Sequence, residues 1–130
     1  MKDECRRDKY VTTMGGRRRK LNDLTSVRVG ARNRAERVAV NFVVQGSAAD
    51  LIKRAMVRLD AKVRAPQFVG SCRLVLMVHD ELLFEVRSDR VREVAELVSR
   101  EMEAAMPMDV TTPVKISFGP SWGQLQPLRR

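Results

Sequence analysis

Arg73-Leu-Val-Leu-Met-Val-His-Asp-Glu-Leu-Leu-Phe-Glu-Val-Arg87 is the run of residues around which we expect the rest of the chain to be organised. Its two mostly apolar runs are rich in Val, Leu and Phe, which predicts strands covered on both faces. A hairpin over 73–87 would place His79, Asp80 and Glu81 at its tip. Because two neighbouring carboxylates are costly to bury, this tip either faces solvent or holds a divalent cation with hard oxygen ligands.

The composition predicts one small domain with a basic end. The chain has 130 residues and a net charge of +9, enough length for a real core. Residues 1–37 hold 12 Lys and Arg against 5 Asp and Glu, whereas residues 38–130 hold 13 against 11. A basic first third on a nearly neutral body favours a polyanionic partner, nucleic acid first. A solvated or disordered basic tail is the alternative.

Several classes of protein are disfavoured by the same sequence. Cys5 and Cys72 lie far apart without a CxxC motif, as expected of free thiols in a reducing compartment. No apolar run approaches the length of a membrane span, and the charged N-terminus lacks the core of a signal peptide. We therefore expect a soluble, intracellular protein with no membrane partner.

A basic hairpin is predicted over residues 10–21. Tyr10–Met14 is a short β-prone run, Gly15-Gly16 is a turn signal, and Arg17, Arg18, Arg19 and Lys20 follow. Four consecutive cations repel one another unless something neutralises them, and phosphates would do so. A run resembling a nuclear-localisation signal is the alternative interpretation.

Helices are predicted over residues 29–64, with a polar stripe on the first. Apolar residues recur there at helical spacing. Beside them the donor-bearing side chains Arg34, Arg37, Asn41 and Gln45 share one face at steps of 3, 4 and 4, and all can donate to phosphate, sugar or base edges. An ordinary polar face is the alternative. We expect Gly46-Ser47 to break or kink this helix and Ser47 to begin a capping box for a second one.

The C-terminal part predicts a helix over 88–106 and a strand over 112–118. Ser88 is the expected N-cap. The glutamates of the helix, Glu101 among them, are expected on a solvated acidic face, and Trp122 is expected as a core anchor. The element order predicts the α+β class, with an antiparallel sheet and helices packed on one side.

Four ordered motifs resemble the C-terminal palm portion of family A DNA polymerases. They are Tyr10-Val-Thr-Thr with Gly16-Arg-Arg-Arg19, Ala35-Glu-Arg37 with Asn41 and Gln45-Gly-Ser-Ala-Ala-Asp50, Val78-His-Asp-Glu-Leu82, and Gly119 with Trp122. The resemblance covers roughly residues 9–126. The sequence of residues 41–50 is particularly similar to that of the nu and theta branch of these polymerases. A nuclear location is expected for that branch.

The resemblance implies roles for particular residues. Asp80 would bind catalytic Mg²⁺, Glu81 would support that site, and His79 would lie beside the primer terminus. The donor stripe would contact the DNA primer–template near the forming base pair, and Arg17–Arg19 would approach the DNA backbone. The implied activity is template-directed transfer of deoxynucleotides from deoxynucleoside triphosphates to a primer 3′-OH in replication or repair.

The chain also departs from the family pattern. The strand with the other metal-binding aspartate and the fingers helix that binds the incoming nucleotide normally lie upstream, and neither is found here. We therefore expect the isolated chain to be inactive and only marginally stable, with one open edge at the 73–87 hairpin. Two alternatives stay open: a non-catalytic DNA-binding module that retains the palm surface, and a metal nuclease, which a single acidic pair supports weakly.

Overall fold

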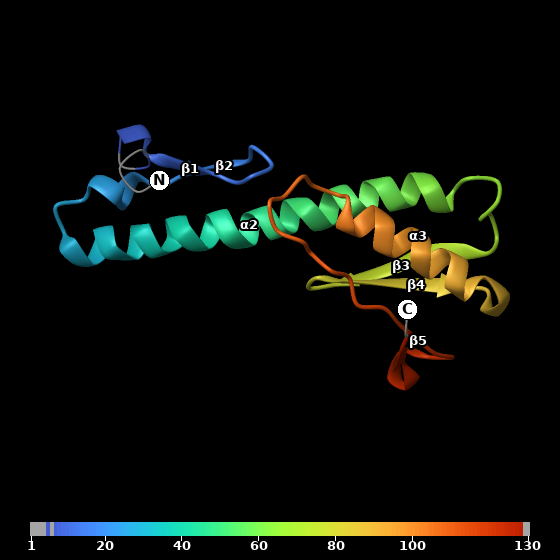
Figure 1. Ribbon diagram of the computed structural model, residues 1–130. Coiled ribbons are helices and arrows are strands. Elements are labelled where there is room, and N and C mark those ends of the chain that lie inside the picture. Colours follow the sequence, from blue (N-terminus) through green and yellow to red (C-terminus); the bar gives the residue numbers. More distant parts are fainter. Residues whose placement is uncertain (1–4, 6, 129–130) are drawn as a thin grey trace. The chain divides into compact units, whose positions relative to one another are not determined.

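The computed structural model describes residue 5 and residues 7–128, which fold as two compact units, 1–51 and 52–130 (Figure 1). In chain order the elements are β1 (Tyr10–Thr12), β2 (Arg18–Lys20), the 3-10 helix η1 (Asn22–Thr25), α2 (Val29–Val63), β3 (Cys72–Val78), β4 (Glu81–Val86), η2 (Ser88–Arg90), α3 (Val91–Glu103), β5 (Ser117–Phe118), η3 (Trp122–Gln124) and β6 (Gln126–Pro127). None of the described helices is long and apolar enough to cross a membrane.

In the first unit, a short hairpin packs on α2. β1 pairs antiparallel with β2 across the turn that contains Gly16, whose φ of +88° lies in the region that favours glycine. Val11 on β1 and Leu24 on η1 are buried against Ala35 and Ala39 of α2. Two alanines on the helix face leave room for the hairpin backbone, so the hairpin can lie close to α2.

The helix α2 runs without a break from Val29 to Val63, so the expected break at Gly46-Ser47 is wrong. The Ser47 hydroxyl donates to the Val43 carbonyl oxygen four residues earlier instead of capping a new helix. Gly46 is buried where Thr13 of the hairpin approaches, and a Cβ there would lie 2.6 Å from Thr13 Cγ2. Tertiary contact with the hairpin therefore accounts for the small residues that resembled a helix boundary.

In the second unit, helices cover one side of the β3–β4 hairpin. The hairpin is antiparallel, with an irregular register between Leu74 and Leu76. Its half-buried Leu82, Phe84 and Val86 pack on a core formed by the end of α2, the loop after it, and α3. The buried members of this core are Leu59, Val63, Phe68, Cys72, Val94, Leu97 and Val98.

The strand β3 is not covered on both faces in this chain. Val75, Leu76 and Met77 are 52%, 41% and 43% exposed. Within the described part of the chain, β3 pairs with β4 and with no other strand. The edge that was expected to be open is therefore open here, and it carries apolar side chains.

The C-terminal part differs from expectation in three places. The strand expected over 112–118 is limited to Ser117–Phe118, which pairs with β6. Trp122 is 54% exposed, so it is not a core anchor. Ser88 makes no side-chain cap hydrogen bond, because the chain enters α3 through the 3-10 helix η2. The α+β class is confirmed, and the described strands form three separate two-stranded sheets.

One glutamate of α3 is buried, contrary to the expected solvated face. The Glu101 side chain is 8% exposed and its Oε2 accepts from Arg58 of α2, with Arg58 Nη2 at 2.9 Å. Burial raises the pKa of the Glu101 carboxyl, but the Arg58 hydrogen bond, assisted by the charges of Arg58, Lys62 and Arg100, outweighs burial and holds the pKa below its ordinary value. The carboxylate form therefore stabilises the second unit.

We predict that Glu101→Gln lowers the free energy of unfolding by about 1.5–3 kcal/mol at neutral pH, the usual contribution of a hydrogen bond to a charged group. Because the folded-state pKa is depressed, this contribution is present above the ordinary carboxyl pKa of 4.5 and is lost as the pH falls through the lower folded-state value. Urea unfolding of wild type and variant between pH 7 and pH 3 measures the difference. Glu96→Gln, on an exposed position of α3, is the matched control. A difference that stays constant down to pH 3 would contradict the role of Arg58.

Candidate nucleic-acid interface

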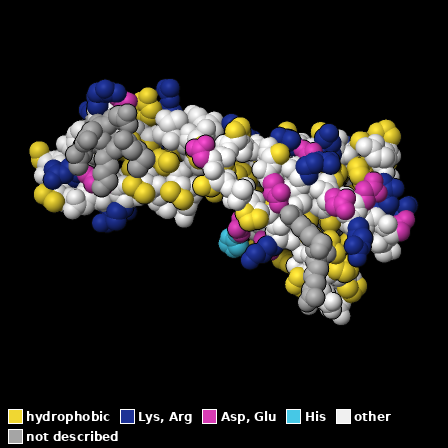
Figure 2. Space-filling view, viewed as in Figure 1, with side chains coloured by type: hydrophobic (Ala, Val, Ile, Leu, Met, Phe, Trp, Pro, Cys, Tyr) yellow, Lys and Arg dark blue, Asp and Glu magenta, His cyan; other side chains and the backbone are white. Residues whose placement is uncertain are grey.

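The acidic tip lies between β3 and β4, in the second unit. His79 and Asp80 form the turn and Glu81 begins β4, and all three side chains are exposed. Figure 2 shows the single histidine of the chain at the molecular surface beside acidic side chains. His79 has a φ of +54°, a conformation that few non-glycine residues adopt. The two-stranded hairpin thus presents Asp80 and Glu81 directly to solvent.

The tip alone does not fit a complete magnesium site. In the described residues there is no group of three or more His, Cys, Asp or Glu side chains that could hold a metal ion. Mg²⁺ requires near-octahedral oxygen coordination, and a two-metal site needs carboxylates from more than one element. Asp80 and Glu81 are therefore at most part of a donor set.

The donor stripe on α2 is an exposed surface of the first unit. Arg34, Arg37, Asn41 and Gln45 are all exposed, and Asn41 Nδ2 lies 3.4 Å from Gln45 Oε1. At about 100° per residue, the stripe lies on the side of α2 turned away from the hairpin that covers Ala35 and Ala39. The structure therefore brings these four side chains together on one helix face.

Two valines beside the stripe were missed by sequence reasoning. Val40 and Val44 are exposed and, with Arg37 and Asn41, line a shallow open hollow. The signal in the sequence was the spacing of four residues between the two valines. Apolar side chains between hydrogen-bond donors suit a surface of mixed character, such as sugar and phosphate.

The hairpin cations do not share one face. In the register of the hairpin Arg19 lies opposite the buried Val11, and its guanidinium is 5.6 Å from the centroid of the Phe42 ring on α2. Arg18 is on the other face, 4.9 Å from the Tyr10 ring. Side-chain alternation along a strand separates neighbours in this way. The three arginines therefore differ in environment, although they are consecutive in sequence.

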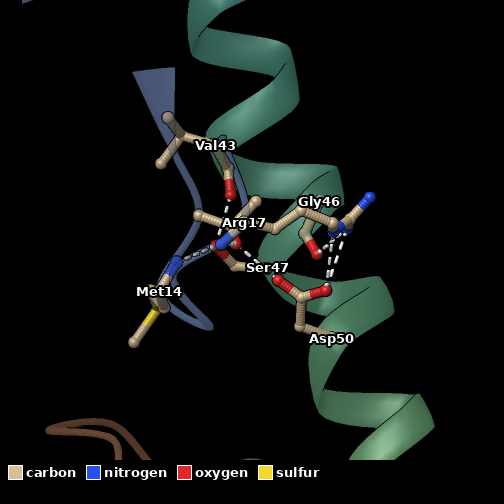
Figure 3. A network of polar contacts seen from close by, with 7 residues as sticks. Met14, Arg17, Val43, Gly46, Ser47 and Asp50 are labelled. Carbon is tan, nitrogen blue, oxygen red and sulfur yellow. Dashed lines mark hydrogen bonds and ion pairs between the residues drawn. The ribbon is translucent and has the colours of Figure 1, made fainter. Parts of the chain in front are cut away.

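Arg17 is held by a network that sequence reasoning did not find (Figure 3). The Asp50 carboxylate accepts from Arg17 Nε at 3.0 Å and Arg17 Nη2 at 2.9 Å, and also from the Thr13 hydroxyl. Arg17 Nη2 donates to the Gly46 carbonyl oxygen at 2.9 Å, and the Met14 backbone N–H donates to Ser47 Oγ at 2.9 Å. The stretch that was predicted as a capping box is therefore the place where the hairpin docks.

An α+β fold with an exposed donor stripe, consecutive arginines and an acidic hairpin tip is the combination expected of a nucleic-acid-binding protein. The chain belongs to DNA polymerase family A, whose family model matches residues 1–124.

Curated relatives support this family membership. The chain is 42% identical to DNA polymerase I of Mycobacterium leprae over 121 residues, which is 93% of this chain and 13% of the relative. It is 44% identical to DNA polymerase I of Bacillus subtilis over 119 residues, 92% of this chain and 13% of the relative. The chain therefore spans about 13% of the length of these relatives.

A solved structure has the same fold. The POL domain of Pol1 from M. smegmatis, in complex with a DNA primer–template and dNTP, is 44% identical with a TM-score of 0.76. The match covers 85% of this chain and 19% of that chain. The finer likeness to the nu and theta branch stays a prediction.

We predict opposite effects for two glycine-to-alanine changes in α2. Gly46→Ala places a Cβ 2.6 Å from Thr13 Cγ2, so we expect the free energy of unfolding to fall by about 1–3 kcal/mol through overpacking. Gly30→Ala meets no atom within 4 Å, so we expect an unchanged or higher value, by up to about 1 kcal/mol from helix propensity. Urea unfolding of both variants measures this, and equal stabilities would contradict the close approach of the hairpin.

Proposed function

We propose that the chain is the C-terminal palm segment of a DNA-directed DNA polymerase, which transfers deoxynucleotides to a primer 3′-OH under template direction. The observation that carries the proposal is the match over most of the chain, at 44% identity, to a polymerase domain in complex with a DNA primer–template and dNTP. Primer–template and deoxynucleoside triphosphates are the partners proposed for the whole protein. The bacterial relatives are consistent with an intracellular protein and give no support to a nuclear location.

The α2 stripe is the proposed surface for the primer–template. Its two arginines supply positive charge for phosphates, and its two amides can donate to sugar or base edges. The exposure of all four side chains supports this assignment, since none is used in the core.

Asp80 is proposed as one ligand of a magnesium ion whose other ligands lie outside the described residues. Family A polymerases are generally dependent on divalent metal ions, which neutralise charge on the transferring phosphates. By resemblance, Glu81 supports this ligand and His79 lies beside the primer terminus. The exposed tip between two paired strands supports the assignment.

A second candidate function is a non-catalytic DNA-binding module. The observation that favours it is the incomplete donor set at the acidic tip within the described residues. Such a module would bind primer–template through the same α2 stripe but would add no nucleotide. Binding and extension assays therefore separate the two functions.

We predict that replacing both stripe arginines, Arg34→Ala with Arg37→Ala, weakens binding of a primer–template duplex and lowers the salt slope of log K by about 1.8, at 0.9 for each lost phosphate contact. Fluorescence anisotropy over a salt series measures this. The matched control is Arg64→Ala, which removes an exposed arginine that pairs with Asp60 in the second unit. The same slope for the double variant and wild type would remove the stripe from the interface.

We predict that Asp80→Asn nearly abolishes primer extension. The test uses a chimaera of Bacillus subtilis DNA polymerase I in which residues 1–124 of this chain replace the matching segment. Asparagine keeps the shape of the side chain but loses the charge that holds a metal ion, so duplex binding should change little.

Two matched variants accompany this test of Asp80. Glu81→Gln should be milder, because a supporting carboxylate need not ligate the metal directly. Asp89→Asn removes an exposed carboxylate that pairs with Arg87, and it should extend primers like the parent chimaera. Wild-type extension by Asp80→Asn would contradict the palm assignment, and an inactive parent chimaera that still binds duplex would favour the non-catalytic module.

A further inference from the structure

We propose that Asp50 is a positioning residue that fixes the β1–β2 hairpin on α2, so that Arg18, Arg19 and Lys20 bind phosphate while Arg17 does not. This inference rests on the proposed DNA binding and divides the cationic run into one structural and three binding side chains. It makes the stretch Gly46–Asp50 a docking site for the hairpin.

Asp50 of α2 binds residues at both ends of the β1–β2 turn. The Asp50 side chain is 13% exposed. Its Oδ1 accepts from both Nε and Nη2 of Arg17, and its Oδ2 accepts from the Thr13 hydroxyl. Thr13 Oγ1 in turn accepts the Arg17 backbone N–H at 3.1 Å. One carboxylate therefore holds both ends of the hairpin turn, with one oxygen bound to Arg17 and the other to Thr13. The bonds from Arg17 are charge-assisted and therefore stronger than neutral ones.

The β1–β2 hairpin needs the Asp50 contact to stay folded on α2. Its strands have three residues each, and an isolated two-stranded hairpin is marginal at best in water. Consecutive cations on β2 add repulsion that opposes the fold. Burial of Val11 supplies part of the docking energy, and the Asp50 network supplies a fixed register on the helix.

The three cations of β2 remain accessible to a partner. Arg18, Arg19 and Lys20 are exposed, and in the described part of the chain no carboxylate pairs with any of them. Arg18 stacks over Tyr10 and Arg19 over Phe42, which orders each guanidinium while its N–H groups stay accessible. A polyanion is the partner that such ordered, unneutralised cations fit.

The direction in which Asp50→Asn changes DNA affinity distinguishes positioning from long-range electrostatic attraction. Asp50→Asn removes a negative charge, so long-range attraction alone predicts tighter binding to DNA. Positioning predicts weaker binding, because the hairpin cations lose their fixed place. Asp60→Asn, on an exposed position of the same helix where Asp60 pairs with Arg64, is the matched control for charge and should bind equally or more tightly.

A salt series separates positioning from mere loss of stability. A destabilised variant lowers the binding-competent fraction, and circular dichroism at each salt concentration measures that fraction, so the slope can be corrected for it. Loss of hairpin phosphate contacts lowers the slope by about 0.9 for each contact. We expect Asp50→Asn to lower the slope by up to about 2.7, at about 0.9 for each of the three hairpin cations, and to lower the affinity for a primer–template duplex at least about tenfold at low salt.

A double-variant comparison tests the connection directly. Arg18→Ala with Arg19→Ala should lower the slope by about 1.8 in the wild-type background and by much less in the Asp50→Asn background. Arg17→Lys keeps the charge but loses the paired Nε and Nη2 donors to Asp50. It should therefore behave like Asp50→Asn.

If Asp50→Asn fails to fold, judged by circular dichroism, Thr13 provides the test. Thr13→Val loses the hydroxyl and should lower the slope, whereas Thr13→Ser keeps the hydroxyl and should bind like wild type. An unchanged slope for Asp50→Asn, or for Thr13→Val, in a chain that binds duplex would overturn the positioning role alone. A wild-type chain that does not bind the duplex would overturn the proposed function and this inference with it.

Discussion

The first unit depends on one carboxylate that is largely withdrawn from water. Asp50 lies on α2 and takes hydrogen bonds from Thr13 and Arg17 across 37 and 33 residues of sequence. A withdrawn carboxylate is costly unless it is paired and hydrogen-bonded, and the hairpin satisfies both conditions. The hairpin in turn gains a fixed place on a helix whose alanines and Gly46 let it approach. The contact therefore links a short, highly charged strand pair to the element that carries the donor stripe.

The second unit also contains a buried carboxylate, Glu101, which pairs with Arg58 and so joins α3 to α2. Around that pair the apolar core covers one side of the β3–β4 hairpin, while Val75, Leu76 and Met77 stay exposed. An exposed apolar strand edge is a liability in a soluble chain. The chain also spans about 13% of the length of its curated relatives. Within the described residues, β3 keeps one unpaired edge.

The sequence predicted those features that local patterns control. Apolar runs and turn signals identified both hairpins. Helical spacing identified the main helices and the exposure of Arg37 and Asn41, because burial periodicity is a local property. It failed where distant contacts override local signals. Gly46-Ser47 resembled a helix boundary, although the hairpin contact explains both residues, and Glu101 resembled a solvated side chain until Arg58 was placed beside it. Neither partner could be found from spacing alone.

We propose that the donor stripe of α2 is the surface that contacts the primer–template. The most direct measurement is a titration of the chain with a primer–template duplex, followed by NMR of the side-chain amide groups. We predict saturable shifts for Asn41 and Gln45 on the stripe, with Gln124 in the second unit as an internal reference. Saturable binding of the duplex that leaves the Asn41 and Gln45 signals unmoved would contradict the account.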